Sequence, residues 1–143
     1  LNAIHGDPIP VYGDGKQVRN WLFVRDFCTA IDAVLVNGQA GEVYNVGGPD
    51  EETNLDVVKA ILALTGRDES LITYVEDRLG HDLRYSLSAA KTQALGWKAA
   101  VNFAQGIEST VAWYRDNPQW WQALRSGEYR EYYERQYGVD LGA

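Results

Sequence analysis

The segment Ile9-Pro10-Val11-Tyr12-Gly13-Asp14-Gly15, followed by Gln17-Val18-Arg19-Asn20-Trp21-Leu22-Phe23-Val24, carries the strongest structural signal in the chain. Its first residues are extended in character, and Asp14-Gly15 is a strong hairpin-turn signal, so 17–24 is expected to return as the second strand. Side chains alternate with period two along a strand, and pairing across this turn puts Tyr12 and Arg19 on one face. The sequence therefore predicts a hairpin that presents a ring beside a guanidinium.

Working outward from this segment, helical and extended patterns alternate. Asp26 is a plausible N-cap of a helix that Gly38 stops, and Thr53 caps a second helix that Gly66 ends. The remaining expected elements are strands at 42–46, 71–75 and 84–87, a brief helix after Ser88, a helix at 103–114 and a tyrosine-rich tail. This alternation predicts the α/β class. About four short strands are too few for a complete doubly wound sheet.

The composition of the chain argues against some classes of function and location. The 143 residues carry 13 Lys and Arg against 20 Asp and Glu, a net charge of −7, which disfavours nucleic-acid binding. No apolar run approaches the roughly 20 residues of a membrane span. The single cysteine, Cys28, favours a reducing, cytoplasmic setting. The length fits one domain, but the chain starts at Leu1 and contains no methionine, so we expect that an upstream segment is missing.

Two constellations suit a nucleotide. The ring of Tyr12 can stack on a base or ribose, while the Arg19 guanidinium can make a bidentate contact with phosphate. The alternative is that Tyr12 packs against the core while Arg19 faces solvent, and surface arginines are common. Asn45 ends an expected strand just before Gly47-Gly48, where open α/β sheets bind ligands. The alternative is that Gly47-Gly48 only forms a strand-to-helix turn, which needs residues that can adopt positive φ.

A third constellation is the loop Asp77–Asp82, with Arg84 close behind it. Arg78, His81 and Arg84 gather donors in an acidic chain, which suits a diphosphate, and Gly80 lets the loop turn between them. The alternative is a solvated loop with weak Asp–Arg pairs. No dinucleotide fingerprint and no phosphate-binding P-loop is present. The two histidines are too few and too far apart in sequence for a zinc site, so no metal is expected.

Taken in order, these motifs resemble the C-terminal part of the dTDP-glucose 4,6-dehydratases, which are extended short-chain dehydrogenases/reductases acting on nucleotide sugars. The resemblance covers essentially the whole chain. The matching stretches are Pro10–Gly15, Arg19–Asp26, Gly41–Gly48, Thr53–Leu55, Asp77–Tyr85, Leu95–Trp97, Thr110–Tyr114 and Tyr132–Gly138. This chain has Asn20, Phe23, Arg25 and Leu79 where the family usually has Asp, Tyr, Glu and Pro.

The resemblance implies a set of substrate-binding residues. Pro10, Val11 and Tyr12 match the stretch that lines the nucleotide. Arg19 matches the arginine that grips the diphosphate, and Asn45 matches a second polar contact to it. The loop that closes over the nucleotide end is matched by Asp77, Arg78, Leu79, Gly80 and His81.

For the parent protein, the resemblance implies a lyase that converts dTDP-glucose to dTDP-4-keto-6-deoxyglucose in rhamnose-type deoxysugar biosynthesis. It also implies that bound NAD, the catalytic Tyr-x-x-x-Lys pair and the usual homodimer contacts belong to a missing N-terminal part. Residues 1–143 are then a C-terminal nucleotide-sugar-binding domain fragment without catalytic residues. Two alternatives stay open: part of another nucleotide-sugar epimerase, decarboxylase or reductase, and a non-catalytic binding module.

Overall fold

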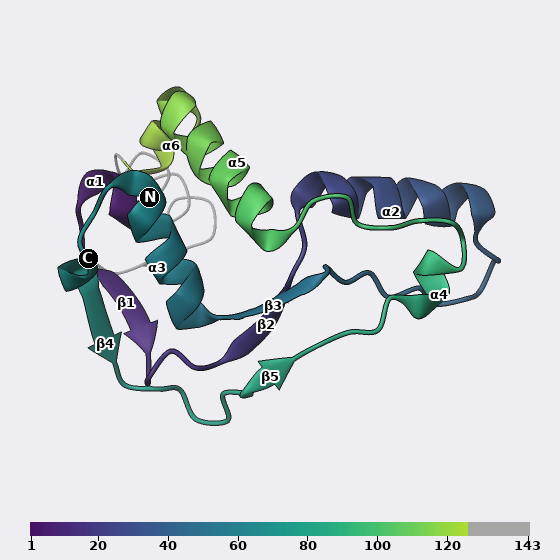
Figure 1. The fold of residues 1–143 in the computed structure, drawn as a ribbon, viewed down its shortest axis with the longest axis horizontal. Coiled ribbons are helices and arrows are strands. Elements are labelled where there is room, and N and C mark those ends of the chain that lie inside the picture. The colour runs from purple at the N-terminus through teal and green to yellow at the C-terminus, as the bar shows by residue number, and fades with distance from the viewer. Residues whose placement is uncertain (126–143) are drawn as a thin grey trace, which may run out of the picture. The chain divides into compact units, whose positions relative to one another are not determined.

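Strands and helices alternate along the chain in the computed structural model, which describes residues 1–125 (Figure 1). This confirms the α/β class. The elements are α1 (Asn2–His5), β1 (Ile9–Tyr12), β2 (Val18–Trp21), α2 (Val24–Asn37), β3 (Asp50–Thr53), α3 (Asn54–Thr65), the 3-10 turn η1 (Glu69–Leu71), β4 (Ile72–Val75), β5 (Arg84–Tyr85), α4 (Ala90–Gln93), α5 (Phe103–Asp116) and α6 (Pro118–Arg125). The tyrosine-rich tail and its matched motif Tyr132–Gly138 lie outside the described residues.

The predicted hairpin is wrong, and the turn that forms is centred on Gly13 and Asp14, one residue earlier than predicted. Gly15 N–H donates to the Tyr12 carbonyl at 3.1 Å, but β1 pairs in parallel with β4, and β2 joins a separate sheet between β3 and β5. A two-residue hairpin of the common type needs positive φ at both central residues. Here the positive φ angles belong to Gly13 (57°) and Gly15 (72°), and Asp14 has none. The chain therefore leaves the turn in a direction that does not bring β2 back along β1.

The predicted strand at 42–46 is also wrong, since that segment has no strand structure. Side chains from elsewhere in the chain bind backbone groups in this segment and just after it. Asn20 accepts from Gly48 N–H at 2.7 Å, and Thr92 donates to the Asn45 carbonyl at 2.6 Å. The following acidic residues, expected as a loop, form β3 instead and pair antiparallel with β2.

Helix α2 forms as predicted and ends at Gly38, but Asp26 does not cap it. Phe23 is the N-cap, and Asp26 lies in the first turn with 5% of its surface exposed. Its Oδ2 accepts from the backbone N–H groups of Ala100 (3.1 Å) and Val101 (2.9 Å). The carboxylate therefore joins α2 to the segment before α5.

Small residues of α2 contribute to a core cluster built from Ala30, Ala89 and Trp97. The predicted apolar stripe of α2 is buried only in part, because its large members Phe27, Ile31 and Leu35 are exposed. Helix α3 begins as predicted: Asp56 N–H donates to the Thr53 hydroxyl at 3.1 Å. It ends at Gly66, whose φ is 66°.

The chain divides into two compact units, residues 1–111 and the residues from 112 onward. In the second unit, the rings of Trp113, Tyr114 and Trp120 meet edge to face. Trp121 donates its indole N–H to the Tyr114 carbonyl at 2.8 Å. Among the helices of residues 1–125, none has the length and apolar character needed to cross a membrane.

Candidate functional site

The site forms where the parallel strands β1 and β4 end side by side. Tyr12 and Val75 are register partners, so the turn after β1 and the loop after β4 leave the same edge of the sheet. Gly13 N–H donates to the Val75 carbonyl at 3.0 Å. A Cβ at Gly13 would lie only 3.0 Å from a carboxylate oxygen of Asp77, so the absence of a side chain lets the loop approach. This edge brings the β4–β5 loop against the turn that leads to β2.

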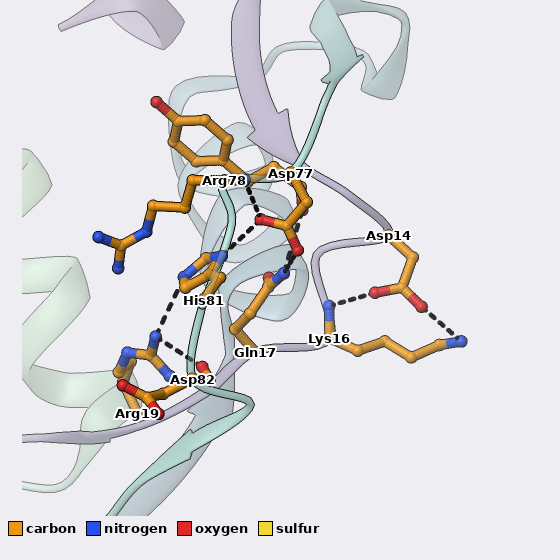
Figure 2. Close-up of polar contacts among 9 residues, drawn as sticks. Asp14, Lys16, Gln17, Arg19, Asp77, Arg78, His81 and Asp82 are labelled. Atoms are coloured by element: carbon orange, nitrogen blue, oxygen red, sulfur yellow. Dashed lines mark hydrogen bonds and ion pairs between the residues drawn. The ribbon is translucent and has the colours of Figure 1, made fainter.

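His81 lies at the centre of the loop, with 6% of its side chain exposed. Its Nδ1 is 2.6 Å from Asp77 Oδ1, and its Nε2 is 3.2 Å from Arg19 Nη2 (Figure 2). A guanidinium can only donate, so Nε2 must accept and the proton must lie on Nδ1, which donates to Asp77. The ring also meets the Tyr12 ring edge to face at 6.0 Å. His81 is thus a neutral imidazole with both nitrogens engaged.

Asp77 is held from three directions. Besides His81, Gln17 Nε2 donates to its Oδ2 at 3.0 Å, and the backbone N–H of Arg78 donates to its Oδ1 at 2.9 Å. These hydrogen bonds favour the carboxylate and lower the pKa of Asp77, with the bond from His81 contributing most. Gln17 is itself buried and also donates to the Tyr12 carbonyl at 3.3 Å. The loop is therefore anchored to the residue that precedes β2.

Arg19 is restrained without being neutralised. Its Nη1 donates to the Val18 carbonyl at 2.7 Å and its Nη2 to the Asp82 carbonyl at 3.1 Å. The guanidinium also lies 4.4 Å from the centre of the Tyr85 ring. Arg19 forms no ion pair with any carboxylate of the described chain. Its positive charge therefore remains available to an anion.

The two other cations of the loop region differ. Within residues 1–125, the Arg78 guanidinium has no hydrogen-bond or ion-pair partner. Arg84 was expected to add donors to the loop, but it binds Glu51 instead. Its Nε donates to Glu51 Oε2 at 2.9 Å and its Nη2 donates to Glu51 Oε1 at 2.7 Å. The pKa of Glu51 is lowered, chiefly by this hydrogen bond. The structure thus leaves Arg19 and Arg78 as the cations free for a ligand.

The remaining predicted site residues are placed as follows. Leu79 is fully exposed at the tip of the loop, where Gly80 adopts a φ of 71°. Pro10 is exposed on β1, and the side chain of Val11 is buried, with 4% exposed. Asn45 is exposed, and among the described residues it has no hydrogen bond to Arg19 or to the loop.

Three residues of this region were not predicted: Gln17, Asn20 and Tyr85. Gln17 lies two residues before Arg19, so the period-two pattern already placed both side chains on one face. Tyr85 is the register partner of Arg19 across the parallel β2–β5 pair, which no sequence pattern revealed. Asn20 Nδ2 donates to the Gly48 carbonyl at 2.9 Å while its Oδ1 accepts from Gly48 N–H, and this two-way contact shapes the backbone just after Asn45.

Two expected absences concern a catalytic Tyr–Lys pair and a metal site. The expectation that the chain has no counterpart of a Tyr-x-x-x-Lys pair needs correction, because Tyr12 and Lys16 have that spacing. They flank the turn after β1, and Lys16 Nζ points away from His81 to Asp14, 2.9 Å away (Figure 2). This geometry gives Lys16 no access to the His81 cluster. In the part of the chain that the structure describes, no three His, Cys, Asp or Glu residues gather as metal ligands.

Several known proteins are similar to this chain in sequence and fold. The family model for GDP-mannose 4,6 dehydratase matches residues 2–110. The dTDP-glucose 4,6-dehydratase of Neisseria meningitidis is 48% identical over 142 residues, covering 91% of this chain and 40% of that protein. The chain thus spans about 40% of the length of such curated relatives.

Solved structures show the same likeness. The dTDP-glucose 4,6-dehydratase from Bacillus anthracis, in complex with NAD, matches with a TM-score of 0.80 and 48% identity, over 86% of this chain and 39% of that one. DesIV, the dTDP-glucose 4,6-dehydratase from Streptomyces venezuelae with NAD and TYD bound, matches with a TM-score of 0.82 and 45% identity, over 86% and 38% of the two chains. The chain belongs to the GDP-mannose 4,6 dehydratase family and, within it, is similar to the dTDP-glucose 4,6-dehydratases.

Proposed function

We propose that residues 1–143 form the nucleotide-sugar-binding part of a dTDP-glucose 4,6-dehydratase, a lyase of the cytoplasm that serves deoxysugar biosynthesis. The observation that carries the proposal is Arg19, a guanidinium held in place by Val18, His81, Asp82 and Tyr85 yet left without a carboxylate partner among the described residues. Its five N–H groups make three hydrogen bonds, so Nε–H and one Nη1 hydrogen remain for a ligand. A diphosphate supplies acceptors of the matching charge.

The other predicted residues fit around that diphosphate. Tyr12, half exposed and in contact with the His81 ring, offers a face to the nucleoside. Arg78 supplies the second free cation, and Leu79 and Gly80 complete the loop over the nucleotide end. Pro10 and Val11 provide the adjacent strand, and Asn45 adds a polar contact.

In this proposal the chemistry belongs to a segment outside these 143 residues. NAD binds there, as the NAD complexes of the solved relatives suggest. That segment also supplies the acid/base residues and the dimer contacts. The role of this chain is to bind and orient the nucleotide sugar, with no bond made or broken by its own side chains.

Calorimetric titration of the full-length protein with dTDP tests the proposal. Arg19→Ala is expected to weaken binding by about 1.5–3 kcal/mol, the range for hydrogen bonds to charged groups. Lys16→Ala is the matched control, because it removes a cation that is paired with Asp14 and directed away from the site. Unchanged affinity in Arg19→Ala, or an equal loss in Lys16→Ala, would contradict the assignment.

The same titration separates the proposal from an epimerase, decarboxylase or reductase acting on UDP-sugars. A dehydratase of this kind is expected to bind dTDP more tightly than UDP. Tighter binding of UDP would favour the alternative enzymes. A protein that binds neither nucleotide would instead be an interaction module of another kind.

A further inference from the structure

We propose that Tyr85 is a positioning residue for Arg19, and that the face of its ring is the platform on which the guanidinium is presented to the diphosphate. The inference rests on the proposed function and adds to the site a residue that the sequence motifs did not predict. Its basis is a direct contact, since the central carbon of the Arg19 guanidinium lies 4.4 Å from the centre of the Tyr85 ring. At this range the negative face of an aromatic ring attracts a cation.

The backbone places the ring beside Arg19. The two residues are register partners in the parallel β2–β5 pair, so their side chains leave the same face of the sheet. Strand β5 has only two residues, and Arg84 holds it by two hydrogen bonds to Glu51 of β3. Because β2 lies between β3 and β5, this ion pair spans β2 and fixes β5 against it. Arg84, which is not free for a ligand, thus keeps Tyr85 in register with Arg19.

The hydroxyl end of Tyr85 is also fixed. It donates to the carboxylate of Asp82, and the backbone carbonyl of Asp82 accepts from Arg19 Nη2 at 3.1 Å. Asp82, Tyr85 and Arg19 therefore contact one another in a closed set of three. The hydrogen bond to Asp82 is the main cause that raises the pKa of Tyr85, so the phenol keeps its proton. The ring is thus a neutral and restrained surface.

The electrostatic consequence explains why a ring suits this position. A carboxylate there would also orient Arg19, but it would cancel the charge that a diphosphate needs. The ring face attracts the guanidinium and leaves its positive charge in place, and a contact with a ring face uses none of the five N–H groups. Stacking therefore leaves the Nε–H and the second Nη1 hydrogen of Arg19 available to the ligand.

Restraint before binding is the expected benefit. An arginine side chain has many rotamers, and ordering it in advance reduces the entropy that ligand binding must otherwise overcome. The Tyr85 ring limits the positions of the guanidinium from one face, while the Val18 and Asp82 carbonyls hold it by its edge. Tyr85 therefore contributes to dTDP affinity through Arg19.

Calorimetric titration of full-length variants with dTDP tests the ring. Tyr85→Leu removes it and is expected to weaken binding about fivefold, the size of a cation–π contact at an exposed site. Tyr85→Phe keeps the ring and is expected to bind within about twofold of wild type, since the cation–π contact is retained. Unchanged affinity in Tyr85→Leu, or equal losses in Tyr85→Leu and Tyr85→Phe, would overturn the proposal.

Tyr74→Leu is the matched control. Tyr74 is also an exposed strand tyrosine, but it lies on β4, whose strand partner is β1 and not β2. Its replacement should leave dTDP affinity unchanged. A loss equal to that of Tyr85→Leu would contradict a specific role for Tyr85.

A double-mutant cycle with Arg19→Ala separates positioning from direct contact. If Tyr85 acts through Arg19, Tyr85→Leu causes no further loss of dTDP affinity once Arg19 is alanine. An undiminished loss in the Arg19→Ala background would overturn the proposal and indicate that the ring itself contacts the ligand.

A fluorinated ring separates electrostatics from packing. Trifluorophenylalanine at position 85 has nearly the shape of phenylalanine, but fluorine withdraws negative charge from the ring face. We expect it to bind dTDP about threefold more weakly than Tyr85→Phe, because the cation–π contact is weakened. This difference must vanish in the Arg19→Ala background, and equal affinities of the two rings would overturn the proposal. Should Tyr85→Leu fail to fold, as judged by its melting curve, this pair of rings carries the same test.

The controls keep this inference separate from the proposed function. Absence of dTDP binding in the wild-type protein, or normal binding in Arg19→Ala alone, would refute the proposed function. Normal wild-type binding and a clear loss in Arg19→Ala, with an additive Tyr85 cycle, would leave the proposed function intact and remove only the positioning role of Tyr85.

Discussion

Asn20 illustrates, at the scale of one residue, how a single amide can set a stretch of backbone. Its oxygen accepts from Gly48 N–H, and its nitrogen donates to the carbonyls of Gly48 (2.9 Å) and Asp50 (3.2 Å). A carboxylate, which the related dehydratases usually have here, can make only the first of these contacts. The amide therefore satisfies both polar groups of a glycine that no neighbouring strand binds.

The first prediction concerns this residue. Asn20→Ala is expected to lower the free energy of unfolding by about 1–3 kcal/mol, because backbone groups of Gly48 and Asp50 lose their partners. Asn20→Asp, which keeps the acceptor and loses both donors, is expected to lie between alanine and wild type. Urea denaturation of the full-length protein measures both values. Wild-type stability in the alanine variant would show that water replaces these contacts without cost.

A second residue-scale prediction follows from the pKa of Asp77, which its hydrogen bonds lower from the ordinary value of 3.8. A carboxyl whose pKa is lower in the folded state stabilises that state above its unfolded pKa and loses this contribution as the pH falls through the folded pKa. The stability difference between wild type and Asp77→Asn is therefore expected to be full above pH 3.8 and to shrink below it. A difference that grows on acidification would contradict this sign.

At the scale of elements, α2 is joined to the segment before α5 by polar contacts as well as by packing. Asp26 binds two backbone N–H groups of that segment, and Trp97 donates its indole N–H to the Thr29 hydroxyl at 3.0 Å. The core cluster of Ala30, Ala89 and Trp97 lies along the same junction. This junction orders the segment from which α5 begins.

Removal of the carboxylate tests this junction. Asp26→Ala is expected to cost about 1–3 kcal/mol of unfolding free energy, since two backbone donors lose their acceptor. Asp32→Ala, an exposed position on the same helix, is the matched control and should change stability by no more than about 0.5 kcal/mol. Equal effects in the two variants would mean that Asp26 contributes only through the charge of the helix.

At the scale of the whole molecule, a chain of net charge −7 nevertheless presents two cations without carboxylate partners beside the β4–β5 loop, Arg19 and Arg78. The other candidate, Arg84, is neutralised by Glu51. Selectivity for an anion therefore depends on which cations the fold leaves unpaired and not on net charge. This arrangement suits binding of a small anionic ligand in an otherwise acidic protein.

The proposed division of labour predicts that the purified 143-residue chain, supplied with dTDP-glucose and NAD, forms no 4-keto-6-deoxy sugar. The reason is that the 143 residues contain no dinucleotide fingerprint, and that the one Tyr-x-x-x-Lys spacing flanks a turn in which Lys16 pairs with Asp14. Product formation by the full-length protein under the same conditions is the positive control. Product from the short chain would show that catalytic groups lie within it.

The sequence by itself determined the features whose partners are close along the chain. Thr53 caps α3 by binding Asp56 three residues later, and Gly38 and Gly66 end their helices as predicted. The motifs also identified Tyr12, Arg19, Asp77 and His81, which the structure brings into contact. Local propensity and short-range hydrogen bonds are sufficient for such features.

Only the tertiary structure decided which strands pair and which groups surround Arg19. The partner of β1 is β4, some sixty residues away, and not the adjacent β2, because the positive φ angles at Gly13 and Gly15 send the chain elsewhere. Arg19 meets His81 across a separation of 62 residues. Arg84 is equally charged in the sequence but is paired with Glu51. Long-range pairing depends on the balance of all the packing contacts at once, and no local pattern encodes that balance.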